Sequence, residues 1–545
     1  MVRLSALLAL FAIGWCTPFG FGQGSPQVPT IQISTRLVRI DVIVRDKDRP
    51  VENLSKSDFV ILDNHRPQQI SIFSVNSSAS TQQIVPPLPP NTFSDLPQYR
   101  TGASRSVTMV LLDNLNTLYG SAPESEYEAA PAWLEDLALQ NAKVHLTEFL
   151  KKLAPEDRVA IYGLRHSLHV LCDFTCSREQ LLEVLKNYDS RSVTDRAVVE
   201  PGAKHAPVQG GYADAFENGA AAFRAGSANE ERAAETMTAL QQIAAHVANI
   251  PGRKNLVWLT ANLPFPPAAM ARILSPAEIA AYPIDARGLL ARTTPAALDE
   301  HSHTLGSGPG AVSIDGAAPA QSSEPIGLST MEELASDTGG QAFVNTNDIT
   351  GAIRKAVEDS TVTYTLGFYI NRDALDGKFH EVKVEVRGKD LTIRYPRGYF
   401  AFRDATPTKN EDQLRLMTAV QSPIESSSIP VEATVERAAQ PPHWFKVACS
   451  IDAHGLRLAQ NGNLRKGAVD VYSIEQDETG NVLLQSGKTF NLELPESRYD
   501  ALLKSGLLFH ELVQPRPNAT TLRLLVVDRS SNYVGSVIIP LSDVH

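Results

Sequence analysis

The chain has 545 residues, of which 43% are hydrophobic and 20% are charged, and its formal net charge is −11 at pH 7. This length predicts several domains, because a single hydrophobic core stops growing at about 250–300 residues. The acidic balance argues against a general nucleic-acid or anionic-membrane binder, which needs a basic face. The four cysteines are too few for a disulfide-rich scaffold.

The N-terminus has the pattern of an export signal. Arg3 supplies a positive charge, Leu4 to Ile13 is an apolar stretch of signal-peptide length, and a glycine-rich segment ends at Gly24. We therefore predict a signal peptide over residues 1–24 and an exported protein that is periplasmic, attached to the cell surface or secreted. No later stretch approaches the roughly 20 apolar residues of a transmembrane helix, so we expect no transmembrane segment after cleavage.

Residues 25–80 are predicted to form a β segment. Val38, Ile40 and Val42 alternate with polar residues, which is the period of a half-buried strand. Residues 81–104 are rich in Ser, Pro and Gln, and this composition predicts an extended linker.

Residues 105–360 are predicted to form an α/β domain. An apolar strand over residues 107–112 precedes a helical pattern, and strands then alternate with helices as far as residue 357. Such alternation predicts a mainly parallel sheet with helices on both faces. Polar stretches over residues 189–215 and 291–327 are typical of long surface loops.

The rest of the chain is mostly β. Residues 361–401 contain strands and a hairpin, residues 402–430 form a linker with a short helix, and residues 431–545 have the pattern of a β-sandwich. Residues 25–80 and 361–401 each offer too few strands for a stable domain, and each has an apolar face to bury. We therefore predict that they pair into one β-domain, with the α/β domain inserted between them.

Polar residues follow the first strand of the α/β domain at once. Asp113, Asn114 and Asn116 come directly after the apolar run. In an open α/β sheet, ligands bind at the carboxyl ends of the strands, so these side chains are candidates for a binding edge. The alternative is that they cap the following loop by hydrogen bonding to backbone N–H groups.

A later strand ends at Asp285, close to Arg287. This pair either contacts a ligand at the same edge of the sheet or forms an internal salt bridge that orders a loop. Together with Asp113, Asn114 and Asn116, Asp285 completes the predicted partner-binding edge.

Cys172 and Cys176 enclose the three residues Asp-Phe-Thr. In an oxidising compartment the two cysteines could form a disulfide that closes this small loop. Unpaired thiols at the end of a strand are the alternative. A zinc site has less support, because it needs four ligands and no Cys/His pair lies nearby.

A series of short motifs runs through residues 107 to 400. It comprises Leu111-Leu112-Asp113, Asp157-Arg158-Val159-Ala160, Asp173-Phe174-Thr175, Arg253-Lys254-Asn255-Leu256, residues 282–289, Thr338-Gly339-Gly340, residues 345–348, residues 364–369 and Gly398-Tyr399-Phe400. In this order and spacing the motifs resemble the bacterial, Acidobacteria-type VWFA-related domain proteins. The resemblance implies a von Willebrand factor A-like (vWA) domain of Rossmann type, and it implies no particular reaction.

The resemblance also implies a cation site at the first strand end, where vWA domains carry Asp-x-Ser-x-Ser. Asp113 and Thr117 match two of those ligands, and Asn262 could supply a carbonyl oxygen. Leu115 replaces one hydroxyl, and Ala261 stands where a later Asp is expected. Because Mg²⁺ requires near-octahedral oxygen ligands, we expect a degenerate site with no resident cofactor and at most weak Mg²⁺ binding.

The sequence lacks the motifs of several enzyme classes. It contains no His-Glu-x-x-His, no Gly-x-Ser-x-Gly and no phosphate-binding Gly-rich loop with Lys, so we assign no catalytic residues. The leading hypothesis is an exported, non-enzymatic interaction or adhesion-type protein that binds a protein partner. The alternatives are a secreted hydrolase with catalytic residues in the loops 189–215 and 291–327, and a structural component of a cell-envelope complex.

Overall fold

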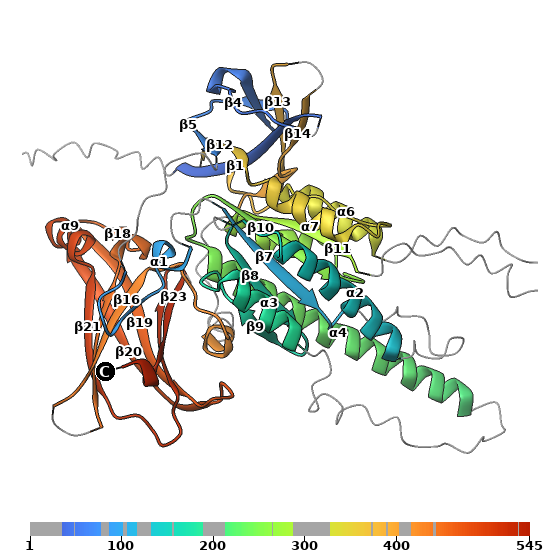
Figure 1. The fold of residues 1–545 in the computed structure, drawn as a ribbon. Helices are drawn as coiled ribbons and strands as arrows, with labels where there is room; N and C mark the ends of the chain where they lie inside the picture. The colour runs from blue at the N-terminus through green and yellow to red at the C-terminus, as the bar shows by residue number, and fades with distance from the viewer. Residues whose placement is uncertain are drawn as a thin grey trace, which may run out of the picture.

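The computed structural model describes residues 35–47, 49–77, 87–101, 106–116, 132–154, 157–188, 213–263, 265–286, 327–371, 374–388, 391–402, 416–439, 443–531 and 533–544. The predicted signal peptide lies outside these residues. They form an N-terminal β-domain, an α/β domain and a C-terminal β-domain (Figure 1).

The N-terminal β-domain is built from two segments that are far apart in the chain. The first supplies β1 (Thr35–Asp46), β2 (Arg49–Pro50), β3 (Phe59–Asp63), β4 (Arg66–Gln68) and β5 (Ile72–Ser77), and the second supplies β12 (Val362–Asn371), β13 (Phe379–Val386), β14 (Leu391–Arg394) and β15 (Gly398–Phe400). One sheet has the order β14-β1-β12-β5, with β2 beside β1, and the other has the order β15-β13-β3-β4. The α/β domain is therefore inserted between the two halves of this β-domain.

The register of β1 shows why the two segments need each other. β1 runs antiparallel to β12, from Thr35 opposite Asn371 to Val42 opposite Tyr364. Its alternate apolar residues are buried in one core with apolar residues of β3, β12 and β13. Either segment alone would expose that apolar face to water, which is unfavourable.

The α/β domain contains a five-stranded sheet. Its strands are β7 (Ser106–Asp113), β8 (Val159–Leu164), β9 (Leu168–Cys172), β10 (Arg253–Thr260) and β11 (Ile279–Asp285), in the order β11-β10-β7-β8-β9. The first four strands in that order are parallel, and β9 is antiparallel to β8. The predicted α/β class is confirmed. Every residue of β7 after Ser106 is buried, as expected of a strand that is covered on both faces.

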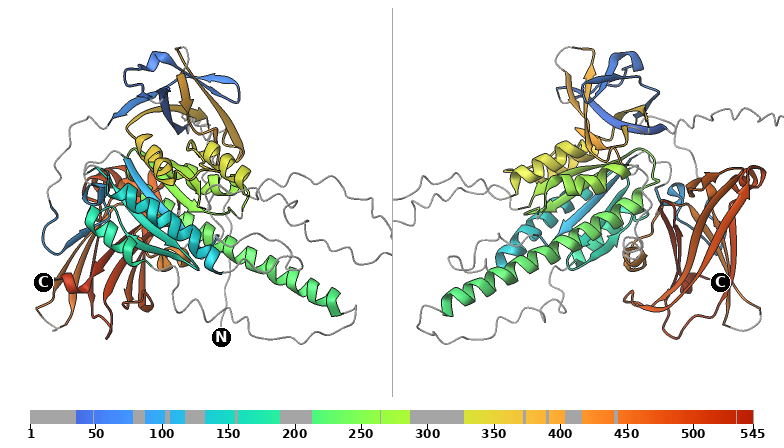
Figure 2. Two further views of the ribbon diagram at one scale, coloured as in Figure 1. Left: turned by 45° about the vertical axis from the view of Figure 1, so that its right-hand side comes forward. Right: turned by 180° about the vertical axis from the view of Figure 1, so that it is seen from behind.

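Helices cover both faces of this sheet. α2 (Ala132–Leu150), α3 (Arg178–Asn187) and α7 (Ile349–Glu358) pack in one core cluster, and α4 (Ala213–Val247), α5 (Pro267–Leu274) and α6 (Leu328–Thr338) pack in the other. α4 has 35 residues, and its N-terminal part projects past the sheet (Figure 2). None of the helices in the described part of the chain is both long and apolar enough to cross a membrane.

The C-terminal β-domain consists of two sheets around one core. Its later strands are β16 (Val431–Arg437), β17 (Phe445–Ile451), β18 (Ala459–Asn461), β19 (Leu464–Gln476), β20 (Val482–Pro495), β21 (Leu507–Val513), β22 (Thr521–Asp528) and β23 (Val534–Pro540), and α9 (Glu496–Ser505) follows β20. One sheet has the order β21-β17-β16-β6, where β6 is Thr92–Ser94. The other has the order β18-β19-β22-β23, with β20 beside β19.

The linker predicted over residues 81–104 needs correction. Within it, β6 (Thr92–Ser94) pairs with β16 of the C-terminal β-domain, and α1 (Pro97–Thr101) follows. Phe93 packs against the core of that domain, so a segment before the α/β domain completes a sheet formed from the end of the chain. The short helix expected in residues 402–430 is present at residues 416–421.

Candidate functional site

Three parallel strands end in polar residues at one edge of the α/β sheet. Asp113 ends β7, Thr260 ends β10 and Asp285 ends β11. Thr260 is aligned with Asp285 in the ladder, so the strand ends lie side by side. The arrow of β7 points away from the N-terminal β-domain and towards the projecting part of α4 (Figure 1). We call this end of the sheet the carboxyl edge.

Asp113 is buried, and both of its carboxylate oxygens accept hydrogen bonds within the protein. Oδ2 accepts from the indole N–H of Trp258 and from the side-chain amide of Asn116, each at 2.9 Å. Oδ1 accepts from the backbone N–H of Asn116 at 3.0 Å. The Asn116 amide also donates to the hydroxyl of Thr236 on α4 at 2.9 Å. The carboxylate of Asp113 therefore connects the turn that follows β7 with β10. Through Asn116, it also connects this turn with α4.

Burial raises the pKa of Asp113, although its hydrogen bonds with Asn116, Trp258 and Thr260 favour the ionised form. A buried carboxylate without donors would be costly, and these donors offset that cost. Trp258 and Thr236 were not identified from the sequence. The sequence did offer one signal for Trp258, because it lies in an apolar strand and a buried indole N–H needs a hydrogen-bond acceptor.

The predicted partner-binding edge needs correction at three of its four residues. Asp113, Asn116 and Asp285 are 1%, 5% and 0% exposed, so they face the protein interior and cannot form the contact surface themselves. Asn114 is half-buried, and its side-chain amide donates to the Tyr188 hydroxyl at 3.4 Å. Arg287, the suggested salt-bridge partner of Asp285, lies outside the described residues.

Other polar residues are exposed around the carboxyl edge. Phe343 forms a parallel bridge with Ile284 of β11, so the residues that follow it lie at the same edge. Among them Asn345, Asn347 and Asp348 are exposed, as are the residues His166 and Ser167 in the β8–β9 turn. The accessible part of this edge is thus a polar rim around an internally bonded carboxylate.

Asn262 has a structural environment of its own. Its backbone N–H donates to the Thr260 hydroxyl at 3.3 Å, and that hydroxyl donates to the Asn262 carbonyl at 2.8 Å. Its side-chain Oδ1 is buried and has no hydrogen-bond partner among the described residues. A Cβ at Gly327, which has φ +101°, would come within 2.5 Å of this oxygen. Asn262 therefore packs against the start of α6, and no described hydrogen bond joins it to Asp113.

The described residues at the carboxyl edge offer few free oxygen ligands for a divalent cation. A cation needs several oxygen lone pairs, whereas both oxygens of Asp113 face N–H donors. Leu115 packs against the core, and the side chain of Ala261 carries no oxygen. Thr117 lies outside the described residues. Among the residues that the structure describes, no group of three or more His, Cys, Asp or Glu side chains could hold a metal ion.

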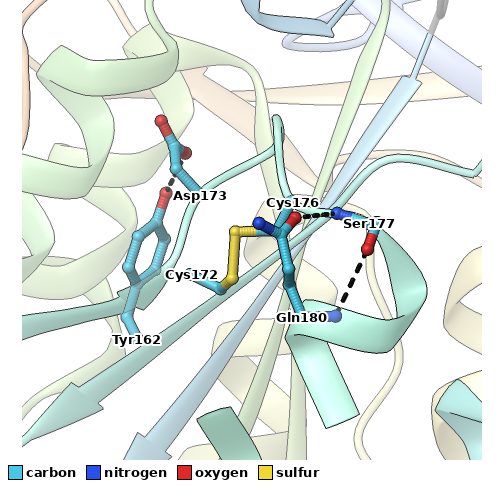
Figure 3. The surroundings of a disulfide bond; sticks show 6 residues. All are labelled: Tyr162, Cys172, Asp173, Cys176, Ser177 and Gln180. Carbon is cyan, nitrogen blue, oxygen red and sulfur yellow. Dashed lines mark hydrogen bonds between the residues drawn. A yellow bond between two sulfur atoms is a disulfide. The ribbon is translucent and has the colours of Figure 1, made fainter. Parts of the chain in front are cut away.

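The two cysteines enclose the short loop between β9 and α3, and Cys172 is the last residue of β9 (Figure 3). Cys172 and Cys176 form a disulfide, with their Cα atoms 6.0 Å apart. Ser177 caps α3 directly after the loop, because its hydroxyl accepts from the backbone N–H of Gln180 at 3.3 Å. The phenol of Tyr162 donates to Asp173 inside the loop at 3.3 Å. The disulfide loop thereby presents Asp173 to the neighbouring strand.

No family model matches this chain, and no curated protein matches it. Solved structures that match include an aerotolerance-related membrane protein from Bacteroides fragilis NCTC 9343, at 11% identity and TM-score 0.25, over 46% of this chain and 98% of that one. They also include proximal thread matrix protein 1 from the mussel byssus, at 9% identity and TM-score 0.26, over 47% of this chain and 48% of that one. A structure of the mussel protein with zinc in its MIDAS motif matches at 8% identity and TM-score 0.23, over 48% of this chain and 47% of that one.

Proposed function

We propose that this chain is an exported, non-enzymatic interaction protein. Its α/β domain is vWA-like, and the carboxyl edge of its sheet binds a protein partner without a bridging cation. The observation that carries the proposal is the closed hydrogen-bond arrangement of Asp113 inside an exposed polar rim. Ligands of open α/β sheets bind at this edge, and here the accessible groups are Asn, Asp, Ser and His side chains, which can hydrogen-bond to a partner.

The same geometry favours a binding role over an acid–base role. A general acid or base must come within hydrogen-bond reach of its substrate. Asp113 is occupied by Trp258 and Asn116, and Asp285 is fully buried. The hydrolase alternative needs residues of the loops 189–215 and 291–327, and these loops lie almost entirely outside the described residues.

Two substitutions at the rim test the proposal. Ser167→Arg in the β8–β9 turn and Ala268→Arg in the first turn of α5 each place a long cation at an exposed position of the carboxyl edge. The matched control is Val144→Arg, on a side chain of α2 that is 60% exposed. In co-purification of the full-length exported protein, we expect a partner that is retained by the control and lost from both edge variants.

Retention of every partner by both edge variants would contradict the proposal. Recovery of all forms in one insoluble envelope fraction, whatever the variant, would favour the structural-component alternative. Turnover of a generic ester, peptide or glycoside by the purified protein would favour the hydrolase.

Cation binding gives a separate test of the degenerate site. A ligand at a 100-fold excess over its Kd stabilises the folded state by about 2.7 kcal/mol. We expect millimolar Mg²⁺ or Mn²⁺ to leave the melting temperature almost unchanged, because N–H donors face both oxygens of Asp113. An upward shift that Asp113→Ala abolishes would show that the site binds a cation after all.

A further inference from the structure

The N-terminal β-domain has a hollow of about 470 Å³ at one end of its two sheets. The end of β12 lines it from one sheet, and the β3–β4 turn and β13 line it from the other. Its volume is within the range of small-molecule sites, about 300–1,000 Å³. It belongs to a different domain from the carboxyl edge.

Buried ionisable groups form the floor of this hollow. Asp63 and His380 are 7% and 8% exposed, and His380 lies between two carboxylates. Its Nδ1 is 3.1 Å from Asp63 Oδ1, and its Nε2 is 3.3 Å from Asp376 Oδ1. The hydroxyl of Tyr399 donates to the other oxygen of Asp63 at 3.0 Å.

These floor groups are already paired with one another. Both oxygens of Asp63 are engaged, and Asp376 Oδ1 also accepts from the backbone N–H of Lys378 at 2.9 Å. Such a buried network is tolerated only when its members have partners. Asp63 and His380 are therefore held in a fixed arrangement, whereas the Asp376 side chain is 40% exposed and keeps a carboxylate charge at the edge of the floor.

The rim of the hollow carries polar groups that are only partly engaged. Asn64, Gln68 and Asn371 bring three neutral side-chain amides. The side-chain oxygen of Asn64 accepts from the backbone N–H of Glu381 at 3.0 Å, which leaves its NH2 group as a donor, and the Gln68 NH2 group lies 3.5 Å from the backbone oxygen of Arg66. Arg66 forms no ion pair with any described residue. Tyr369 is 50% exposed, and within the described part of the chain its ring packs against no other aromatic ring.

We propose that this hollow binds a neutral saccharide unit. Sugar hydroxyls both donate and accept, as the rim amides do, and the carbon face of a sugar ring suits the exposed ring of Tyr369. A simple anion would meet Asp63 and Asp376, and a simple cation would meet Arg66. The mixed charge and the internal pairing of the floor thus favour an uncharged, hydroxyl-rich ligand. This proposal is independent of the proposed protein-binding edge.

The test is titration of the full mature protein, by calorimetry and saturation-transfer NMR, with glucose, galactose, xylose, N-acetylglucosamine and their β-1,4-linked or α-1,4-linked oligomers. We expect saturable binding of at least one of them, a loss of affinity of at least tenfold in Tyr369→Ala, and near-normal affinity in Tyr369→Phe. Val60→Ala, at a side chain that is 38% exposed on β3 and outside the hollow, should bind as the original protein does.

Three results would overturn the saccharide site: no saturable binding of any sugar, unchanged binding in Tyr369→Ala, or displacement of the bound sugar by millimolar glycine or lysine, which would indicate an amino-acid site. The Ser167→Arg variant separates this proposal from the protein-binding proposal. It should leave sugar binding intact, whether or not it loses a protein partner.

Discussion

The α/β domain meets its two neighbours through buried charged clusters of different composition. Towards the N-terminal β-domain, Asp359 accepts from Arg45 of β1 at 2.9 Å, from Arg394 of β14 and from the Tyr282 phenol of β11 at 2.9 Å. The side chain of Asp359 is 0% exposed. We call this set the N-terminal junction, and it has one carboxylate between two arginines.

Towards the C-terminal β-domain, Arg100 of α1 binds Asp173 of the disulfide loop at 2.6 Å and lies 3.9 Å from Glu425. His246, at the end of α4, lies 3.1 Å from Asp173 and 2.5 Å from the backbone oxygen of Glu425. Phe174 stacks on His246 with ring centroids 6.0 Å apart. Arg100, Asp173, His246 and Glu425 form the C-terminal junction.

The difference between the junctions lies in how each responds to a lost partner or to pH. The N-terminal junction depends on a single buried anion. The C-terminal junction has two carboxylates whose pKa values move in opposite directions. Burial alone would raise the pKa of Asp173, but His246 and Arg100 outweigh it and hold the pKa well below its usual value. Burial raises the pKa of Glu425, against the effect of Arg100.

The largest effect is expected at the N-terminal junction. Asp359→Asn removes the buried carboxylate that Arg45 and Arg394 share, and breaking a buried pair in this way costs about 3–5 kcal/mol. The shift of the urea unfolding midpoint measures the loss. The control is Glu493→Gln, which removes an exposed pair with Lys466 worth about 0–1 kcal/mol. Equal shifts in the two variants would show that Asp359 does not hold this junction.

A smaller loss is expected from Asp173→Asn. Arg100 keeps Glu425 as a second carboxylate, and the Asp173 side chain is 26% exposed, so water compensates part of the change. The lost charged hydrogen bonds correspond to about 1.5–3 kcal/mol. The same urea titration measures this loss of stability. A loss as large as that of Asp359→Asn would show that the two junctions do not differ in their dependence on one carboxylate.

Opening the disulfide loop should weaken the same junction. Replacing Cys172 and Cys176 by Ser frees the loop that presents Asp173 and Phe174, and loop entropy for so short a loop corresponds to about 2 kcal/mol. A double variant that also carries Asp173→Asn should lose less than the sum, because both changes act on the same contacts. Mass spectrometry of unreduced peptides tests the premise, and two free thiols would refute it.

The smallest effect concerns pH and separates the junctions most sharply. Asp95, beside the C-terminal junction, accepts from the backbone N–H of Val431 at 2.7 Å, and burial raises its pKa well above the usual value. Because the pKa of Asp95 is raised in the folded state, its contribution to the free energy of unfolding is fully present below about pH 4. This contribution is lost as the pH rises through the folded-state pKa. Burial raises the pKa of Tyr282 to about 12, so this phenol of the N-terminal junction adds no pH dependence below about pH 10.

Calorimetry between pH 5 and 9 should therefore show a melting temperature that falls with pH less steeply in Asp95→Asn than in the original protein. Glu425→Gln should flatten the remaining slope, because the pKa of Glu425 is raised in the same direction. Identical slopes in all three proteins would show that these two carboxyl groups do not control the stability of the C-terminal junction.

Several features of the fold were predictable because they depend on local patterns. The apolar run that ends at Asp113 predicted a strand covered on both faces, and β7 is such a strand. The alternation in residues 38–44 predicted a face to bury, and that face lies in the core of the N-terminal β-domain. The pattern is weaker in β20, where most residues are exposed and only the last part alternates apolar with polar residues, at Phe490, Leu492 and Leu494.

The segment before the α/β domain shows the limit of such patterns. Its Pro-rich composition predicted a linker, yet Thr92–Ser94 pairs with β16, which follows more than 300 residues later in the printed sequence. A strand of three residues carries too short a pattern to reveal its neighbour. The position of β6 depends on the edge of the sheet in the C-terminal β-domain, where β16 would otherwise lack a neighbour on that side.

The sequence by itself determined which residues are strand or helix formers in the α/β domain and that Asp113 stands at a strand end, because periodicity and residue type act over a few neighbours. Only the tertiary structure decided that Trp258 and Asn116 occupy the carboxylate of Asp113, that Asp359 receives two arginines, and that His380 lies between two carboxylates. A buried charge must find a partner, but which one it finds depends on the approach of distant segments.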